Sequence, residues 1–376
     1  MAMHTPFYMH ALLASCAAEY PAYDAGAREY FHRISAKHYV HAITGLREAL
    51  SGVVSARHSI TIASTVLILC IFERAKPGPS SGVGAHLSGL AQMIQSGSSE
   101  QGSLDIGLAG DDDALRRVVL EGFIFHSATS VPFDPPLDHQ TADLDFAIQL
   151  AQSALDTMSD PADGLLEHPE SPVLGAPPGF FVLVREISLI HREYELCRAD
   201  YHRRLQLWQE INAVGKRLSR YRVLYHTKVS STRFSTQSDR RDAPTTTDTA
   251  ARDSTTSRNN PSSLGPALYM LAAEILLVDM LRGTHALNHP NSGMQTLPSI
   301  PSLVSEGVQL VSLLQPAADY YAEYYGWPIY VLARFAPRKH YRDILLTRVE
   351  AFCDATRNGT MARLADMLRG NPLYES

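Results

Sequence analysis

Apolar residues recur at every third or fourth position along most of the chain, which is the spacing of an amphipathic α-helix. The clearest stripes are Tyr39, Ala42, Ile43, Leu46 and Leu50; Leu87, Leu90, Ala91 and Ile94; Leu183, Ile187, Ile190, Tyr194 and Cys197; Leu268, Leu271, Ala272 and Ile275; and Leu345, Val349 and Phe352. A two-residue alternation typical of strands is approached only at residues 222–229, which are few and follow a helical stretch. The pattern predicts an all-α protein, a large irregular helical bundle.

One segment breaks this pattern. Residues 230–263 are rich in Ser, Thr and Arg and contain almost no apolar side chain, so burial cannot offset the entropy of ordering them. We predict a disordered insertion there. Residues 1–229 and 264–376 then form two helical halves that pack into a single domain, and 376 residues with 45% hydrophobic content can bury a large core.

The charge balance argues against a protein that holds nucleic acid by itself. The 33 Lys and Arg residues face 39 Asp and Glu residues, a net charge of −6, so no global field attracts a phosphate backbone. No direct nucleic-acid contact is therefore expected. A basic stretch before and within the insertion is either a solvated loop or a local site for phosphate contact or nuclear import: Lys216, Arg217, Arg220, Arg222, Arg240 and Arg241.

Cysteine usage and hydropathy indicate the compartment. The four cysteines lie far apart without a Cys-x-x-Cys pair, which favours neither a disulfide framework nor a structural zinc site. The apolar run at residues 60–72 is shorter than the roughly 20 residues of a bilayer span, so we expect no membrane segment. The first 20 residues lack Lys and Arg, and His10 interrupts their apolar stretch, so no secretory signal is expected. Nucleus or cytoplasm is predicted.

Two motifs resemble catalytic sequences in an unsuitable context. Residues 78–82, GPSSG, match a hydrolase nucleophile elbow, but a predicted helix rather than a strand precedes them and Pro79 lies inside the match. A plain turn is favoured. The run at 111–113 resembles the aspartate-rich motif of terpene synthases but lacks the following carboxylate, so we expect Asp113 to cap a helix that begins at Ala114.

A metal site is also not predicted. His191 and Glu195 lie one helical turn apart, but the sequence offers no further ligand at a recognised spacing. Ion pairing of this helix face with nearby arginines is the favoured interpretation. We expect no metal and no cofactor.

Several polar residues stand within otherwise apolar helices, and these are the candidate site residues. They include Glu73, His126 and Arg185, and a further set consists of Glu186, Glu274 and Asp279. Buried charges need partners, so these side chains either pair with one another across helices or line a ligand cavity. Tyr324 and Trp327 are further donors that could face such a cavity.

Taken in order, these segments resemble the fungal-specific transcription factor domain. The most specific piece is an apolar helix that ends at Glu73, a short loop, and a helix carrying the sequence HLSGL at residues 86–90. Other similar pieces are FYMHALLASCAAEY at 7–20, AKHYVHAITGLREAL at 36–50, LRRVVLEGFIFHSATS at 115–130, GFFVLVREISLIHRE at 179–193, PALYMLAAEILLVDMLRG at 266–283 and YYGWPIYVLARFAPRKHYRDILL at 324–346. The resemblance implies a helical domain with an apolar cavity and a dimerising surface.

Two features depart from the family pattern. Family members usually present a six-cysteine zinc cluster before this domain, and this sequence contains none, so reading of DNA by that module is not expected. Residues 333–337, ARFAP, replace a stretch where the family more often keeps small residues and a second acid. A role in transcription would then run through a partner or a bound ligand.

Three functions remain open from the sequence. The first is a regulator of secondary metabolism that senses a hydrophobic metabolite and acts as a homodimer or through a zinc-cluster regulator. The second is a cofactor-independent cyclase or isomerase that folds a terpenoid or polyketide by shape and orientation. The third is a gene product that lacks an upstream zinc-cluster exon. The ligand-pocket candidates are Glu73, His126, Arg185, Tyr324 and Trp327.

Overall fold

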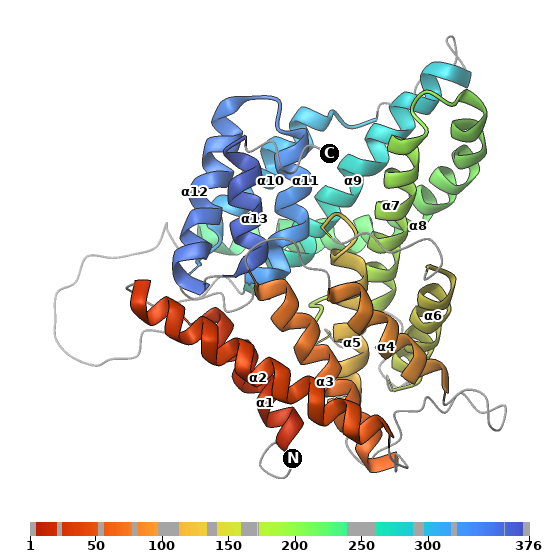
Figure 1. The fold of residues 1–376 in the computed structure, drawn as a ribbon. Helices are drawn as coiled ribbons and strands as arrows, with labels where there is room; N and C mark the ends of the chain where they lie inside the picture. The colour runs from red at the N-terminus through yellow and green to blue at the C-terminus, as the bar shows by residue number, and fades with distance from the viewer. Residues whose placement is uncertain are drawn as a thin grey trace.

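The computed structural model describes residues 5–20, 25–51, 56–76, 82–96, 113–133, 141–158, 171, 173–238, 261–288, 297–316, 322–356 and 358–370. In these ranges the chain forms thirteen α-helices and a short 3-10 helix, without a strand (Figure 1). The predicted all-α bundle is confirmed.

The helices follow one another along the chain with the following bounds: α1 Pro6–Glu19, α2 Ala25–Ser51, α3 Ala56–Ala75, α4 Val83–Ser96, α5 Asp113–Thr129, α6 Thr141–Met158, α7 Pro178–Leu196, α8 Tyr201–Ser238, α9 Pro261–Asn288, α10 Ile300–Leu313, the 3-10 helix η4 Ala322–Tyr325, α11 Gly326–Phe335, α12 Lys339–Thr356 and α13 Gly359–Leu368. Helices α1, α7 and α10 have proline in their first turn, where the missing N–H costs no helical hydrogen bond.

The predicted apolar stripes form the core. In α7, Leu183, Ile187, Ile190 and Tyr194 are all buried. In α2 the stripe is buried only in part, because Leu50 at its end is 51% exposed. Buried apolar side chains from α1 through α13 join into a single cluster.

Helix α9 runs through the middle of the protein and packs against α7, α8, α10 and α11. Its segment Leu264–Thr284 is 21 residues long and apolar enough to cross a bilayer, which the sequence interpretation overlooked. In the protein, 83% of its most apolar stretch is buried, as expected of a central core helix. Residues 264–284 therefore resemble a membrane span only in length and composition.

Part of the predicted insertion lies in helices. Helix α8 continues to Ser238 and α9 begins at Pro261, while residues 239–260 lie outside the described part. The insertion and the boundaries of the two halves stay predictions. Most of the two catalytic-like motifs, residues 78–81 and 111–112, also lies outside the described part of the chain. Helix α5 begins at Asp113 itself, one residue before the predicted start.

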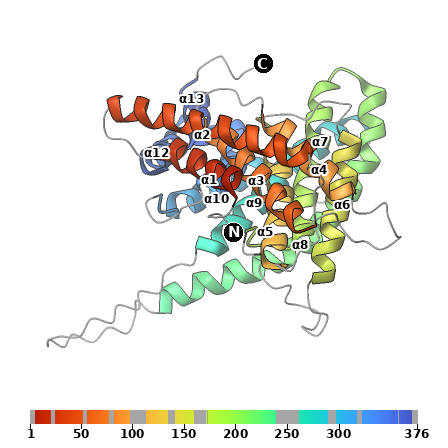
Figure 2. The same cartoon turned by 60° about the horizontal axis from the view of Figure 1, so that its bottom comes forward.

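The first helices of the chain lie beside its last helices. Both views place α2 near α12 and α13, whereas α6, α7 and α8 occupy the opposite side (Figures 1 and 2). Helix α1 packs on α2 and α3, and α13 packs on α3, α11 and α12. The N-terminal helices and the C-terminal helices therefore meet around the end of α3.

Candidate functional site

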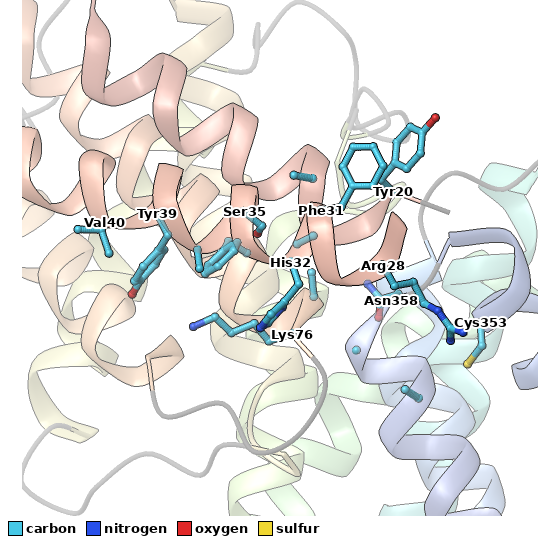
Figure 3. Close-up of a pocket in the computed structure, with 17 residues that line it drawn as sticks. Tyr20, Arg28, Phe31, His32, Ser35, Tyr39, Val40, Lys76, Cys353 and Asn358 are labelled. Carbon is cyan, nitrogen blue, oxygen red and sulfur yellow. The ribbon is translucent and has the colours of Figure 1, made fainter. Parts of the chain in front are cut away.

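A cavity of about 510 Å³ lies where these two groups of helices meet (Figure 3). We call it the α2–α13 cavity. Its walls come from α1, α2, the end of α3, α12 and the start of α13. It is lined by Ala17, Ala18, Tyr20, Arg28, Phe31, His32, Ser35, Ala36, Tyr39, Val40, Phe72, Ala75, Lys76, Cys353, Asn358, Gly359 and Ala362. Its volume lies within the range of small-molecule pockets.

The base of the cavity is apolar and tightly packed. Phe72 and Ala75 of α3 are almost fully buried, and the ring of Tyr39 stacks on that of Phe72 at 4.5 Å. The ammonium of Lys76 lies over both rings, 4.7 Å from the centre of Tyr39 and 4.6 Å from that of Phe72. It also donates a 2.8 Å hydrogen bond to Glu73 Oε1. Burial, and then the neighbouring Glu73, raise the pKa of Tyr39.

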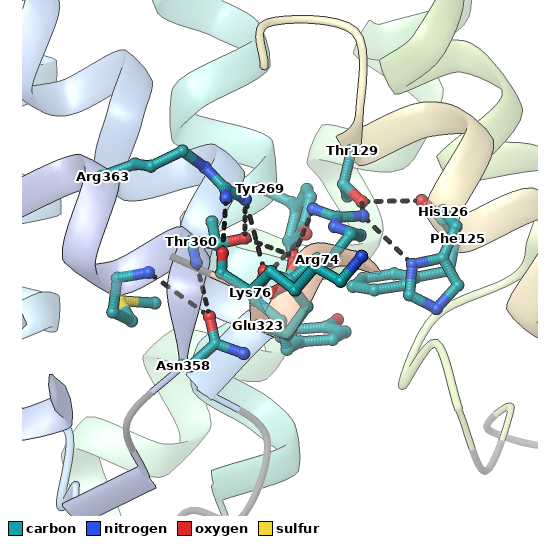
Figure 4. A network of polar contacts seen from close by, with 12 residues as sticks. Arg74, Lys76, Phe125, His126, Thr129, Tyr269, Glu323, Asn358, Thr360 and Arg363 are labelled. Atoms are coloured by element: carbon teal, nitrogen blue, oxygen red, sulfur yellow. Dashed lines mark hydrogen bonds and ion pairs between the residues drawn. The ribbon is translucent and has the colours of Figure 1, made fainter. Parts of the chain in front are cut away.

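Beside the cavity, a buried ion pair joins the N-terminal and C-terminal helices (Figure 4). The guanidinium of Arg74, from α3, pairs with Glu323 of η4. It also donates to Thr129 Oγ1 at 2.6 Å and lies 3.1 Å from His126 Nδ1. Burial, and then the charge of Arg74, hold the pKa of His126 well below its usual value, so the neutral imidazole accepts from Arg74.

Helix α13 is tied to the same network by Arg363. Its guanidinium donates to the carbonyl oxygens of Lys76 at 3.1 Å and Arg74 at 3.3 Å, which belong to the end of α3. It donates as well to Thr360 Oγ1 at 2.9 Å, and Thr360 in turn donates to Glu323 Oε1 at 3.1 Å. A cation at a helix C-terminus satisfies carbonyls that have no partner within the helix.

The start of α13 forms one wall of the α2–α13 cavity. Asn358 caps this helix, since its Oδ1 accepts from the backbone N–H groups of Thr360 and Met361. Its amide donates to Glu19 Oε1 at 3.4 Å. Burial, and then the nearby Glu323 carboxylate, raise the pKa of Glu19 to about 7. Lys76 and Asn358 therefore both line the cavity and belong to the polar network that surrounds it.

Three of the predicted site residues already have polar partners. Glu73 pairs with Lys76, His126 contacts Arg74, and Arg185 pairs with Asp145 of α6. None of the three predicted residues lines the α2–α13 cavity.

The two predicted aromatic candidates belong to a buried aromatic stack. Tyr324 donates through its hydroxyl to Leu174 O at 2.6 Å, and the ring of Trp327 stacks on that of Tyr269 at 5.3 Å. The Trp327 Nε1–H donates to Ser188 Oγ at 3.2 Å. Trp327 also lines a smaller cavity of about 360 Å³, so the five candidates do not share one site.

The smaller cavity contains the predicted His191–Glu195 pair. Glu195 pairs with Arg198 and Arg334, each at 2.6 Å, which confirms the predicted pairing with arginines. Asp279, one of the polar residues expected to pair across helices or to line a cavity, has its Oδ2 3.2 Å from His191 Nε2. Ligand atoms of His191, Glu195 and Asp279 lie within 4.8 Å of one another, but the two guanidinium groups beside Glu195 oppose a further cation there.

The sequence interpretation also missed the basic residues of the α2–α13 cavity. Arg28 and His32 lie four positions apart on α2, and this spacing places both on one helix face. This four-residue spacing was the feature of the sequence that could have identified the two residues. It was weak, because exposed basic residues on a helix usually face only solvent.

The fold defines a large all-α domain, and comparison with known proteins identifies the family. The sequence model of the fungal specific transcription factor domain matches residues 1–370, so the chain belongs to this family. Membership supports a regulatory role and agrees with the resemblance seen in the sequence. No curated protein and no solved structure matches the chain.

Proposed function

We propose that this chain is a nuclear regulator of secondary metabolism that binds a hydrophobic metabolite in the α2–α13 cavity. The observation that carries this proposal is the position of the cavity, where α1–α3 meet α12 and α13. A ligand there would contact both groups of helices at once. Family membership supports the regulatory part of the proposal.

The polar network offers a route from ligand to response. Lys76 lines the cavity, and its carbonyl oxygen accepts a hydrogen bond from Arg363 of α13. Asn358 lines the cavity and caps the same helix. A ligand that prefers one packing of α13 against α3 would shift the population towards it, by as much as its affinities for the two packings differ.

The regulator would act through a partner. A net charge of −6 does not favour strong binding of this chain to a phosphate backbone. The chain, alone or as a homodimer, would then reach DNA through a zinc-cluster regulator. A cavity of this volume with an apolar base would hold a compact, largely hydrophobic metabolite.

Transcript measurement tests the proposal. Deleting the gene should change the transcript levels of its target genes. The variant Ala36→Phe, which fills the cavity from α2, should reproduce that change while the protein stays folded. Lys37→Phe adds the same ring at the adjacent exposed position, which does not line the cavity, and should behave as the wild type. Unchanged transcripts together with an accumulating uncyclised intermediate would favour the cyclase or isomerase alternative.

A further inference from the structure

The charged side chains that line the α2–α13 cavity are all basic. Arg28 and His32 contribute from α2 and Lys76 from the end of α3, while no Asp or Glu is among the described lining residues. Figure 3 shows the side chains of Arg28 and His32 reaching from α2 towards Cys353 and Lys76. A one-sided distribution of this kind favours an anionic group over a neutral or cationic one.

The three basic residues differ in what already neutralises them. Lys76 is engaged by Glu73 and by the faces of two aromatic rings. Arg28 and His32 make no hydrogen bond or ion pair with any residue of the described ranges. At neutral pH, Arg28 therefore offers one permanent positive charge, and His32 adds a ring nitrogen that can donate. One cation without a paired acid in the described part of the chain matches a single negative charge.

The rest of the lining requires an apolar body on the same molecule. Phe72 and Ala75 form the buried base, and Ala17, Ala36 and Ala362 leave space above it. The carboxyl of Glu19 lies behind Asn358 rather than in the lining. Burial raises its pKa to about 7, so it repels an incoming anion less than an ordinary glutamate would. The cavity thus combines an apolar base with a cationic rim.

We infer that the α2–α13 cavity binds an amphipathic monocarboxylic acid, with the carboxylate held by Arg28 and His32 and the apolar body over Phe72 and Ala75. This inference rests on the proposed function, because it names the chemical class of the metabolite. Arg28 is the specificity-determining residue, since a guanidinium presents paired donors that match the two oxygens of a carboxylate.

Titration of the purified full chain with decanoate and with decanol at neutral pH tests the inference. The two probes share an apolar chain and differ in the head group, an anionic carboxylate in decanoate and a neutral hydroxyl in decanol. We expect decanoate to bind about tenfold more tightly than decanol, the difference that one charge-assisted hydrogen bond can provide. The variant Arg28→Gln should abolish this preference and leave decanol binding unchanged.

The control variant is Arg33→Gln. Arg33 lies on the same helix, is 71% exposed, pairs with Glu29 at 3.9 Å and does not line the cavity. The Arg33→Gln variant removes the same charge from the chain as Arg28→Gln does. It should nevertheless keep the tenfold preference for decanoate over decanol. Both arginines are exposed, so both variants should unfold with the wild-type midpoint.

The outcomes separate the inference from the proposed function. Equal binding of decanoate and decanol, blocked in both cases by Ala36→Phe, would overturn the carboxylate inference and leave a hydrophobic ligand in place. An equal loss in Arg28→Gln and Arg33→Gln would overturn it too, because a general surface field would then explain the preference. If neither probe binds the wild type, the inference fails, and the transcripts of the Ala36→Phe strain decide the proposed function separately.

Discussion

Arg74 is a buried cation with three polar neighbours from other segments of the chain. It is 2% exposed and contacts Glu323, Thr129 and His126. Removing a charge from low dielectric surroundings leaves its partner unpaired, and that penalty exceeds the net value of the pair. His126 strengthens the arrangement, because its lowered pKa keeps it neutral beside the guanidinium.

We predict that Arg74→Met lowers the free energy of unfolding by about 3–5 kcal/mol, because Glu323 is left without its cation. The double variant Arg74→Met, Glu323→Gln should recover part of this loss, since it removes the unpaired charge. Urea unfolding measures both. Arg33→Met is the control and should cost no more than about 1 kcal/mol, because the Arg33–Glu29 pair is exposed. A loss of that small size in Arg74→Met would contradict the assigned role.

The raised pKa of Glu19 predicts that the stability of the protein depends on pH. Its pKa is raised from the ordinary 4.5 to about 7 in the folded protein, first by burial and then by Glu323. The folded state therefore holds a proton that the unfolded state has released between these two values. The contribution of Glu19 to the free energy of unfolding is therefore fully present below pH 4.5 and is lost as the pH rises through about 7.

Compared with Glu19→Gln, the wild type should lose on the order of 2 kcal/mol of unfolding free energy as the pH rises through this window. Urea unfolding of both proteins across the window gives the difference directly. Glu29→Gln removes a 68% exposed carboxyl from α2 and is the control. A constant difference between wild type and Glu19→Gln would show that Glu19 ionises equally in both states.

At the scale of the helices, the approach of α13 to α3 depends on a residue without a side chain. A Cβ at Gly359 would lie 2.6 Å from Ala75 O and closer still to Lys76 O, both of them backbone atoms. Backbone cannot rotate away, so any larger residue must push the two helices apart. The same contact positions Asn358 and Lys76 in the cavity wall.

Gly359→Ala should therefore lower the free energy of unfolding by about 1–3 kcal/mol. The matched control is Gly89→Ala in α4, where a Cβ would have no atom within 4 Å. That change should raise stability by up to about 1 kcal/mol, because alanine favours the helix interior over glycine. Thermal unfolding of the two variants compares them. Equal effects of the two changes would show that α3 and α13 do not meet as described.

The helices themselves could be predicted from the sequence, and their polar partners could not. Leu183, Ile187 and Ile190 recur at helical spacing, and burial follows from that spacing alone. The partner of Arg74 lies on η4, far along the chain, where no local pattern indicates it. Arg28 was overlooked for the opposite reason, because its exposure makes it resemble an ordinary solvated residue.

At the scale of the whole molecule, the net charge and the ion pairs of the basic residues determine whether the chain can bind nucleic acid. The basic stretch of α8 is the part of the described chain that most resembles a phosphate contact. Arg217 pairs there with Glu186, and Arg222 pairs with Glu274 at 3.0 Å. Both cations are therefore already partly neutralised, and the full sequence carries an excess of acids.

We therefore predict that the purified 376-residue chain binds random duplex DNA with a dissociation constant weaker than about 10⁻⁴ M at physiological salt. Fluorescence anisotropy of a labelled duplex measures this, and lowering the salt should strengthen binding only slightly, because few phosphate contacts release counterions. The double variant Glu186→Gln, Glu274→Gln frees Arg217 and Arg222 and should bind more tightly with a steeper salt dependence. Submicromolar binding by the wild type would remove the need for a partner in contacting DNA, and the regulator would then act directly.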